Sequence, residues 1–127
     1  MPATVDMYVY MMTNKSRHPF YTGVTNDVVR RSWEHKQGWC IYTERYKLFQ
    51  LIYYERWRNP DSAIAREKRV KRMSRAEKMQ LVLSMNPGWK DLSAEWHERH
   101  RYQPDAVPSQ TEPRDPGRKR RGRDDPS

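Results

Sequence analysis

Two apolar, aromatic segments near the N-terminus, residues 7–13 and 20–24, are separated by only six residues, most of them polar. Aromatic and β-branched residues favour strands, and a short connection that contains Asn and Pro favours a reversal of the chain. The pattern therefore predicts a β-hairpin. Because side chains alternate between the two faces of a strand, Tyr8 and Tyr10 are expected to share one face.

A helix is expected directly after the hairpin. Residues 26–27, Asn-Asp, are good N-cap residues, and Val28, Arg31 and His35 then recur at the spacing of one helical face. Gly38 is a typical end signal. The face that starts at Val28 is therefore apolar at first and cationic farther on, and it carries a guanidinium and an imidazole.

A third strand and two more helices are expected farther along the chain. Residues 49–57 are rich in aromatic and branched apolar side chains, which favours a strand. Residues 59–60, Asn-Pro, have the form of an N-cap followed by proline, and Ser74 with Glu77 has the form of a capping box. Residues 86–88, Asn-Pro-Gly, are expected to end the last of these helices.

Each of these two helices has one row of residues that is expected to face the core. The rows are Ala63, Glu67 and Val70 in the first helix and Met79, Val82 and Met85 in the second. The first row places a carboxylate, that of Glu67, among apolar side chains. Trp89 and Leu92, just after the second helix, are expected to dock back on the core.

The order strand, strand, helix, strand, helix, helix predicts an α/β (α+β) fold: a small three-stranded, mostly antiparallel sheet flanked by helices. Residues 1–92 are expected to form this domain and residues 93–103 a helical extension. Residues 104–127 contain five prolines and few apolar side chains, so we expect a disordered, basic, proline-rich tail. Its run at residues 118–123 could add loose phosphate contacts, or the tail could simply favour solubility.

The chain carries a large positive charge, most of it in the part that is expected to fold. The 127 residues have a formal net charge of +9. Residues 104–127 contain six Lys or Arg against five Asp or Glu, which leaves +1 in the tail and +8 elsewhere. An acidic polymer is therefore the expected partner.

Composition also argues against several classes of protein. No stretch approaches the roughly 18 consecutive apolar residues of a membrane span, and the N-terminus lacks the pattern of a signal peptide. We therefore expect a cytoplasmic protein with no membrane partner. Cys40 is the single cysteine, which excludes an internal disulfide and a zinc site built of several cysteines. We interpret Cys40 as a packed thiol rather than a nucleophile.

Two short tyrosine motifs lie in the two strands of the predicted hairpin. They are Tyr8-Val9-Tyr10 and Tyr21-Thr22-Gly23, with Arg31 and His35 following in the helix. This pattern resembles the GIY-YIG endonuclease family, and in particular the small stand-alone GIY-YIG domain proteins of bacteria, over about residues 6–92. The first motif begins with Tyr8 where the family name has glycine. The resemblance implies a GIY-YIG-like fold and a metal-dependent endonuclease that hydrolyses phosphodiester bonds in DNA.

The resemblance also implies roles for five residues. Tyr10 is expected to be the general base, although a phenol, with an ordinary pKa of about 10, needs a nearby cation or metal for this task. Tyr21 would orient the water or the phosphate, and Arg31 would bind the phosphate with its planar fork. His35 would hydrogen-bond the phosphate or the water. Glu67 would hold Mg²⁺ or Mn²⁺, with water and substrate oxygens completing the coordination.

Several basic residues are candidates for contacts with a nucleic-acid backbone. The candidates are Arg30, Lys68, Arg69, Lys71, Arg72 and Arg75. The alternative is that about half of the basic residues in residues 66–78 only face solvent. Three tryptophans could stack on bases, although for Trp57 and Trp89, unlike Trp96, we favour core packing. His97 and His100 are too few to indicate a metal site.

Each candidate, taken alone, has an ordinary structural explanation as a strand aromatic, an ion-paired charge or a packed imidazole. Together, at these spacings, they favour a structure-selective or non-specific nuclease, with DNA preferred over RNA and a role in DNA repair or recombination as one option. Two alternatives stay open. One is a non-catalytic nucleic-acid-binding module with a GIY-YIG-like fold, and the other is an accessory protein whose tail recruits a partner. The sequence does not predict the oligomeric state.

Overall fold

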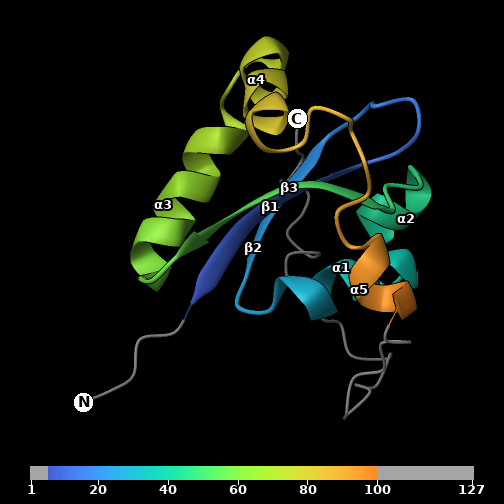
Figure 1. The fold of residues 1–127 in the computed structure, drawn as a ribbon. Helices are drawn as coiled ribbons and strands as arrows, with labels where there is room; N and C mark the ends of the chain where they lie inside the picture. Colours follow the sequence, from blue (N-terminus) through green and yellow to red (C-terminus); the bar gives the residue numbers. More distant parts are fainter. Residues whose placement is uncertain (1–5, 100–127) are drawn as a thin grey trace.

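The computed structural model describes residues 6–99, and Figure 1 shows how their elements are arranged. The elements are β1 (Met7–Thr13), β2 (Tyr21–Thr25), α1 (Val28–Lys36), α2 (Ile41–Arg45), β3 (Gln50–Trp57), α3 (Pro60–Lys71), α4 (Arg75–Met85) and α5 (Ala94–Arg99). The predicted tail, the end of the predicted extension and His100 lie outside the described residues. Among the described residues, the helices are all too short or too polar to cross a membrane.

The three strands form one antiparallel sheet in the order β2-β1-β3. In the middle strand, Tyr10 lies opposite Gly23 of β2 and Tyr54 of β3. The register between β1 and β3 shifts between Met11 and Met12, as it does at a β-bulge. The predicted fold class, a small three-stranded sheet with helices, is confirmed.

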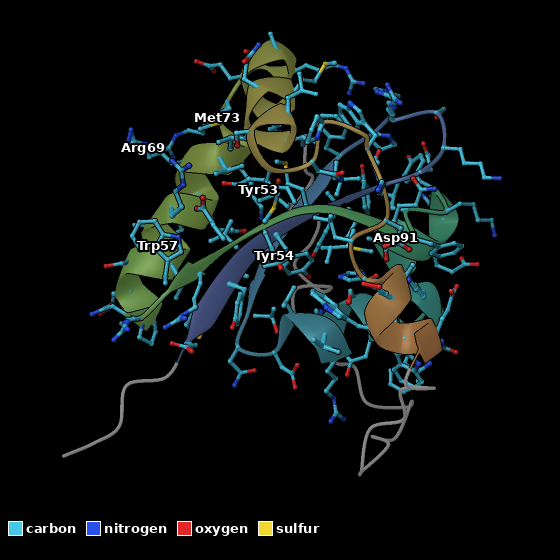
Figure 2. The ribbon with its side chains drawn as sticks, viewed as in Figure 1. Tyr53, Tyr54, Trp57, Arg69, Met73 and Asp91 are labelled. Carbon is cyan, nitrogen blue, oxygen red and sulfur yellow. The ribbon has the colours of Figure 1, made fainter. Side chains whose placement is uncertain are left out.

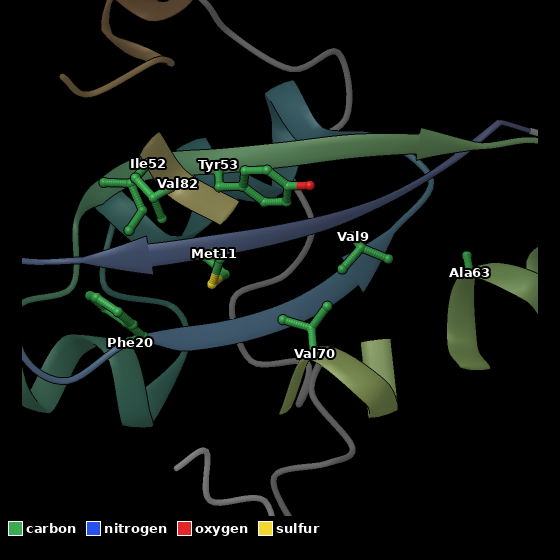
Figure 3. Close-up of a cluster of buried hydrophobic side chains, with 8 residues drawn as sticks. All are labelled: Val9, Met11, Phe20, Ile52, Tyr53, Ala63, Val70 and Val82. Atoms are coloured by element: carbon green, nitrogen blue, oxygen red, sulfur yellow. The ribbon is translucent and has the colours of Figure 1, made fainter. Parts of the chain in front are cut away.

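The side chains of β1 alternate between two cores, one on each face of the sheet. Val9 and Met11 belong to the first core, which Figure 3 shows, and α3 and α4 pack against it. Tyr10 and Met12 belong to the second core, and Tyr8 packs against it from the same strand. Tyr8 and Tyr10 therefore share a face, as the alternation predicts. In Figure 1, α3 and α4 lie on one side of the sheet, and α1, α2 and α5 gather away from them.

Local sequence signals set the starts of three helices. Asp27 caps α1 by accepting a hydrogen bond from the backbone N–H of Arg30 at 3.0 Å. Asn59 caps α3 in the same way, and Ser74 and Glu77 form the predicted capping box of α4. Each cap gives a partner to an N–H group of the first turn, which has none within the helix.

The buried row of α4 differs from the prediction. Met85, expected to face the core, is 40% exposed, whereas Lys78 and Val82 are buried. The reason lies just beyond the helix, where buried Asn86 donates from its side chain to a backbone carbonyl of β3. Lys78, Val82 and Asn86 follow one another at intervals of four, so this row faces the sheet and Met85 turns outward. Met79 packs against the first core, as expected.

The segment after α4 returns to the sheet. Trp89 stacks on Phe20 of the hairpin, with ring centroids 6.0 Å apart. Leu92 donates its backbone N–H to the backbone carbonyl of Leu51 in β3 at 2.8 Å and packs against the second core. The expected docking of Trp89 and Leu92 is therefore confirmed. Trp96 of α5 lies against Tyr54, at a centroid distance of 5.6 Å.

Candidate active site

Tyr10 lies in the middle strand with its ring directly beside Gly23 of β2. The residue is 1% exposed. A Cβ atom added at Gly23 would lie 2.6 Å from the Tyr10 hydroxyl oxygen and 2.7 Å from Cζ of its ring. These distances are shorter than van der Waals contact. Gly23 is therefore required for space, since only a residue without a side chain leaves room for the phenol.

The Tyr10 hydroxyl meets the imidazole of His35, which α1 carries to the same place. The hydroxyl oxygen lies 2.8 Å from Nε2 of the ring. The other ring nitrogen, Nδ1, lies 2.9 Å from the hydroxyl of Thr43 in α2. His35 and Thr43 are fully buried, and buried polar groups need hydrogen-bond partners within the protein. Phenol, imidazole and threonine hydroxyl thus form one buried chain of contacts.

Tyr21 adds a second phenol ring to this cluster. Its ring centroid lies 5.2 Å from that of His35 and 6.2 Å from that of Tyr10. Tyr21 is half-buried, whereas the Tyr10 and His35 side chains are buried. Tyr21 therefore exposes part of its side chain to solvent, unlike the buried pair.

Arg31 places a positive charge near both phenols. Its Nη1 donates to the Glu34 carboxylate at 2.9 Å. Burial lowers the pKa of Arg31, but electrostatic attraction to Tyr10 and Tyr21 and the hydrogen bond to Glu34 raise this pKa by more, so the net shift is upward. The guanidinium is therefore a permanent cation beside the hydroxyl groups of the cluster.

The electrostatic surroundings of His35 keep its imidazole neutral. Burial, and second the charge of Arg31, lower the pKa of His35 well below its ordinary value of 6.5. A neutral imidazole has one N–H donor and one nitrogen that accepts. With Tyr10 at one nitrogen and Thr43 at the other, His35 can exchange a proton with the phenol.

Four of the five predicted site residues come together, and the fifth belongs to a helix on the other face of the sheet. Tyr10, Tyr21, Arg31 and His35 are joined by the contacts given above. Glu67 comes from α3, which packs on the opposite face of the sheet. Its side chain is 12% exposed, and its carboxylate accepts from Lys71 Nζ at 2.7 Å. β2, the strand that carries Tyr21, lies at an edge of the sheet, and α3 also packs against it.

Glu67 suits a magnesium ion by its chemistry. Mg²⁺ prefers oxygen ligands, keeps several waters and is often held by one or two carboxylates together with substrate phosphate. The Lys71 ammonium group occupies one oxygen of Glu67 and would compete with such an ion. Within residues 6–99, groups of three or more His, Cys, Asp or Glu side chains placed to hold a metal ion are absent.

The predicted nucleic-acid-binding residues divide into paired and exposed side chains. Arg30 forms an ion pair with Glu34 at 3.1 Å, and Lys71 pairs with Glu67. Lys68, Arg69, Arg72 and Arg75 are exposed. Figure 2 shows Arg69 on α3, on the side away from α5. Arg75 lies over the ring of Phe20, 4.4 Å from its centroid.

The sequence pattern misses α2 and, with it, Thr43. This helix has five residues, too few for a recognisable helical period, and its first residue, Ile41, is 72% exposed. Its N-cap, Cys40, makes no side-chain capping bond, so it carries no cap signal. Thr43 is eight residues beyond His35, and no local rule relates the two. The buried thiol of Cys40 agrees with the expectation of a packed cysteine.

The fold and the tyrosine–histidine–arginine cluster define a GIY-YIG-type domain. The family model described as the GIY-YIG catalytic domain matches residues 6–80, and the chain belongs to this family of nucleases.

Relatives in several organisms are small proteins that match this chain over most of their own length. A UPF0213 protein of Natronomonas pharaonis is 37% identical over 78 residues, which are 61% of this chain and 91% of that protein. A UPF0213 protein of Syntrophus aciditrophicus is 34% identical over 82 residues, 63% of this chain and 92% of its own length. The solution NMR structure of the UPF0213 protein BH0048 from Bacillus halodurans has 31% identity and a TM-score of 0.45, over 69% of this chain and 94% of that one. None of these names states an activity.

Proposed function

We propose that this domain is a metal-dependent endonuclease that hydrolyses phosphodiester bonds in DNA. The observation that carries the proposal is the 2.8 Å contact between the Tyr10 hydroxyl and Nε2 of His35, with Arg31 beside it. A phenol that has both a proton acceptor and a permanent cation as neighbours is equipped to act as a base. Ordinary strand packing requires neither neighbour.

Tyr10 and His35 act together as the base in this mechanism. The attacking water gives a proton to the Tyr10 oxygen as Tyr10 passes its own proton to Nε2 of His35. The water oxygen bonds to phosphorus, and the bond from phosphorus to the leaving oxygen breaks. The leaving oxygen then takes up a proton from solvent, and His35 gives up the proton it received by way of Tyr10, which restores the starting state. Arg31 stabilises negative charge on the phenol oxygen during the transfer, because its guanidinium stays charged.

Arg31 and Tyr21 are suited to the phosphate. Charge develops on the phosphoryl oxygens in the transition state, and a preorganised cation stabilises it without reorganising solvent. Arg31 can offer a planar fork of donors to two oxygens, provided that it gives up its bond to Glu34. Tyr21, half-buried beside His35, can orient the water or the phosphate from the solvent side.

Glu67 would hold Mg²⁺ or Mn²⁺ in this proposal. The bound ion supplies positive charge for the phosphate and for the leaving oxygen. A phosphodiester at the outer side of β2 could meet Tyr21 and Arg31 on one face of the sheet and Glu67 on the other. The exposed basic residues Lys68, Arg69, Arg72 and Arg75 would contact neighbouring phosphates, which carry no sequence information and favour structure-selective or non-specific cutting. We extend the proposal to a cytoplasmic role in DNA repair or recombination on the resemblance alone.

The test is cleavage of labelled single-stranded, duplex, flap and branched DNA, and of RNA, with and without Mg²⁺ or Mn²⁺. We expect metal-dependent cutting that falls at least about 100-fold in Tyr10→Phe, because a positioned base contributes this much, and that is lost in Glu67→Gln. Tyr46→Phe is the matched control, since Tyr46 is an exposed tyrosine that is not one of the proposed site residues. Glu98→Gln, at an exposed position of α5, is the control for Glu67. Failure to cut any substrate with either metal refutes the proposal.

A second candidate, a non-catalytic nucleic-acid-binding module, is favoured by two ion pairs. Arg31 is bound to Glu34 and Glu67 is bound to Lys71, so the groups proposed for phosphate and metal are both paired within the protein. This candidate predicts DNA binding that is indifferent to metal and to Tyr10→Phe. The same panel, read as binding by fluorescence anisotropy, separates the two functions.

A further inference from the structure

We propose that Thr43 is a positioning residue that fixes which nitrogen of His35 carries the proton, and thereby aims the Tyr10 proton at the imidazole. The inference deepens the proposed function and rests on it for its catalytic meaning. The tautomer itself is a property of the folded protein and can be observed without any substrate.

The Thr43 hydroxyl has a single proton to donate. This hydroxyl donates to the backbone carbonyl of Cys40 at 3.2 Å. It lies 2.9 Å from Nδ1 of His35, and with its proton directed at Cys40 it meets Nδ1 with a lone pair. Nδ1 must therefore be the donor. The neutral imidazole then has its proton on Nδ1 and its lone pair on Nε2.

The state of Nε2 decides the direction of the bond to Tyr10. An unprotonated Nε2 accepts, so the Tyr10 hydroxyl is the donor in the 2.8 Å bond. The phenol oxygen can then take a proton from water at the moment it loses its own. In the opposite tautomer Nε2 would donate to the phenol oxygen, and Tyr10 would have no acceptor at His35 for its proton.

The structure holds this arrangement in place. His35 and Thr43 are fully buried, so a change of tautomer cannot be compensated by solvent at either residue. The Cys40 carbonyl that orients the Thr43 hydroxyl also accepts the backbone N–H of Glu44 at 2.9 Å, within the first turn of α2. The backbone of Thr43 is fixed in turn by the N–H of Leu48, which donates to its carbonyl at 2.8 Å. A helix of five residues thus presents one hydroxyl in a defined orientation.

The experiment compares Thr43→Val, Thr43→Ser and Thr22→Val with wild type. Valine has nearly the shape of threonine but can neither donate to Cys40 nor accept from His35, whereas serine keeps the hydroxyl. Thr22 is the matched control because it is a buried threonine whose hydroxyl has no hydrogen-bond partner within residues 6–99. The readouts are the imidazole ¹⁵N chemical shifts of His35, the kcat and KM of cleavage, and the thermal midpoint.

In wild type and in Thr43→Ser we expect a single tautomer with the proton on Nδ1. In Thr43→Val we expect this preference to be lost. We also expect kcat to fall at least about 10-fold with little change in KM, because a poorly oriented base loses part of the rate that a positioned base contributes. Thr22→Val should keep the wild-type spectrum and rate. If Thr43→Val acted only by making the protein less stable, its thermal midpoint would fall, and Thr43→Ser would not restore the wild-type spectrum and rate.

Two results overturn the inference. One is a wild-type spectrum in which Nε2 carries the proton, which can be recorded even if Thr43→Val does not fold. The other is a Thr43→Val protein that keeps the wild-type tautomer and kcat. If wild type cuts no nucleic acid at all, the proposed function fails, and the spectra still decide whether Thr43 sets the tautomer.

Discussion

Gly23 lies directly opposite Tyr10 in the sheet, and the phenol occupies the space that a side chain at Gly23 would fill. The backbone of Gly23 lies outside the left-handed region, since Gly38 is the one glycine of the described residues with positive φ. The requirement at this position is therefore one of volume.

Gly23→Ala should displace the phenol from His35. A methyl group at 2.6 Å from the hydroxyl oxygen forces a rigid, buried ring to move, at a cost of about 1–3 kcal/mol in the free energy of unfolding. We expect this loss in urea denaturation, together with a large fall in kcat. Gly88→Ala is the control, because an added Cβ there meets only Lys90 atoms, at 3.7 Å. Equal stability of the two variants would contradict this reading of the space around Tyr10.

The buried imidazole of His35 should make the protein less stable in acid. Its pKa is lowered in the folded state, so below the ordinary value of 6.5 the unfolded chain binds more protons than the folded one. Stability is thus fully present above that value and is lost as the pH falls through it. The contribution of His35 is about 1.4 kcal/mol between neutral pH and pH of about 5.5.

The measurement is the free energy of unfolding from pH 7.5 to about 5.5, for wild type and His35→Gln. The variant should lose most of the slope. Burial also lowers the pKa of His97. His97 is unchanged in His35→Gln, so a shallow slope of stability against pH should remain in the variant. A slope that is unchanged in His35→Gln would show that another group is responsible.

Removing the carboxylate of Glu34 should strengthen binding to DNA. Glu34 forms ion pairs with Arg30 at 3.1 Å and with Arg31 at 2.9 Å, so it competes with phosphate for both. We expect Glu34→Gln to bind a short oligonucleotide several-fold more tightly at low salt, with a loss of less than about 1 kcal/mol in stability because all three side chains are partly exposed. Anisotropy titration checks this, with Asp61→Asn as a control of equal charge change at an exposed site. Equal gains in both variants would indicate a general effect of net charge.

Lys71 should raise the concentration of metal that the protein needs. Its ammonium group lies 2.7 Å from the Glu67 carboxylate, and a divalent ion must displace it. In Lys71→Met we expect the half-saturating Mg²⁺ concentration for cleavage to fall several-fold, and Mg²⁺ to raise the thermal midpoint more than in wild type. Lys68→Met, an exposed change on the same helix, should respond to Mg²⁺ as wild type does. If Lys71→Met responds to Mg²⁺ as wild type does, Glu67 is not the residue that binds the metal.

The parts of the fold that the sequence predicts are those that rest on neighbouring residues. The hairpin, the cap at Asp27, the Ser74–Glu77 capping box and the row of Ala63, Glu67 and Val70 all follow from local spacing. The convergence of the two tyrosine motifs with the first helix follows from the family resemblance. Local sequence signals are thus sufficient to predict most of the strands and helices of this small domain.

What the sequence does not predict depends on contacts between distant segments. The α4 row is set by Asn86 at the sheet, which turns Met85 outward and buries Lys78. The meeting of Thr43 with His35 needs a five-residue helix that has no periodic signal. The ion pairs of Glu34 and Lys71 follow ordinary helical spacing, but only the folded structure shows that they engage residues of the site.

The docking of residues 86–92 on the sheet has a consequence for what counts as an autonomous folding unit. The family match ends at residue 80, yet Trp89 covers Phe20, and the Asp91 carboxylate accepts the backbone N–H of Leu51 at 3.1 Å. A fragment cut at the end of the match would leave an aromatic ring of the hairpin uncovered and the first residues of β3 without these partners. We therefore expect the cooperative unit to be longer than the recognisable motif and to include residues 86–92.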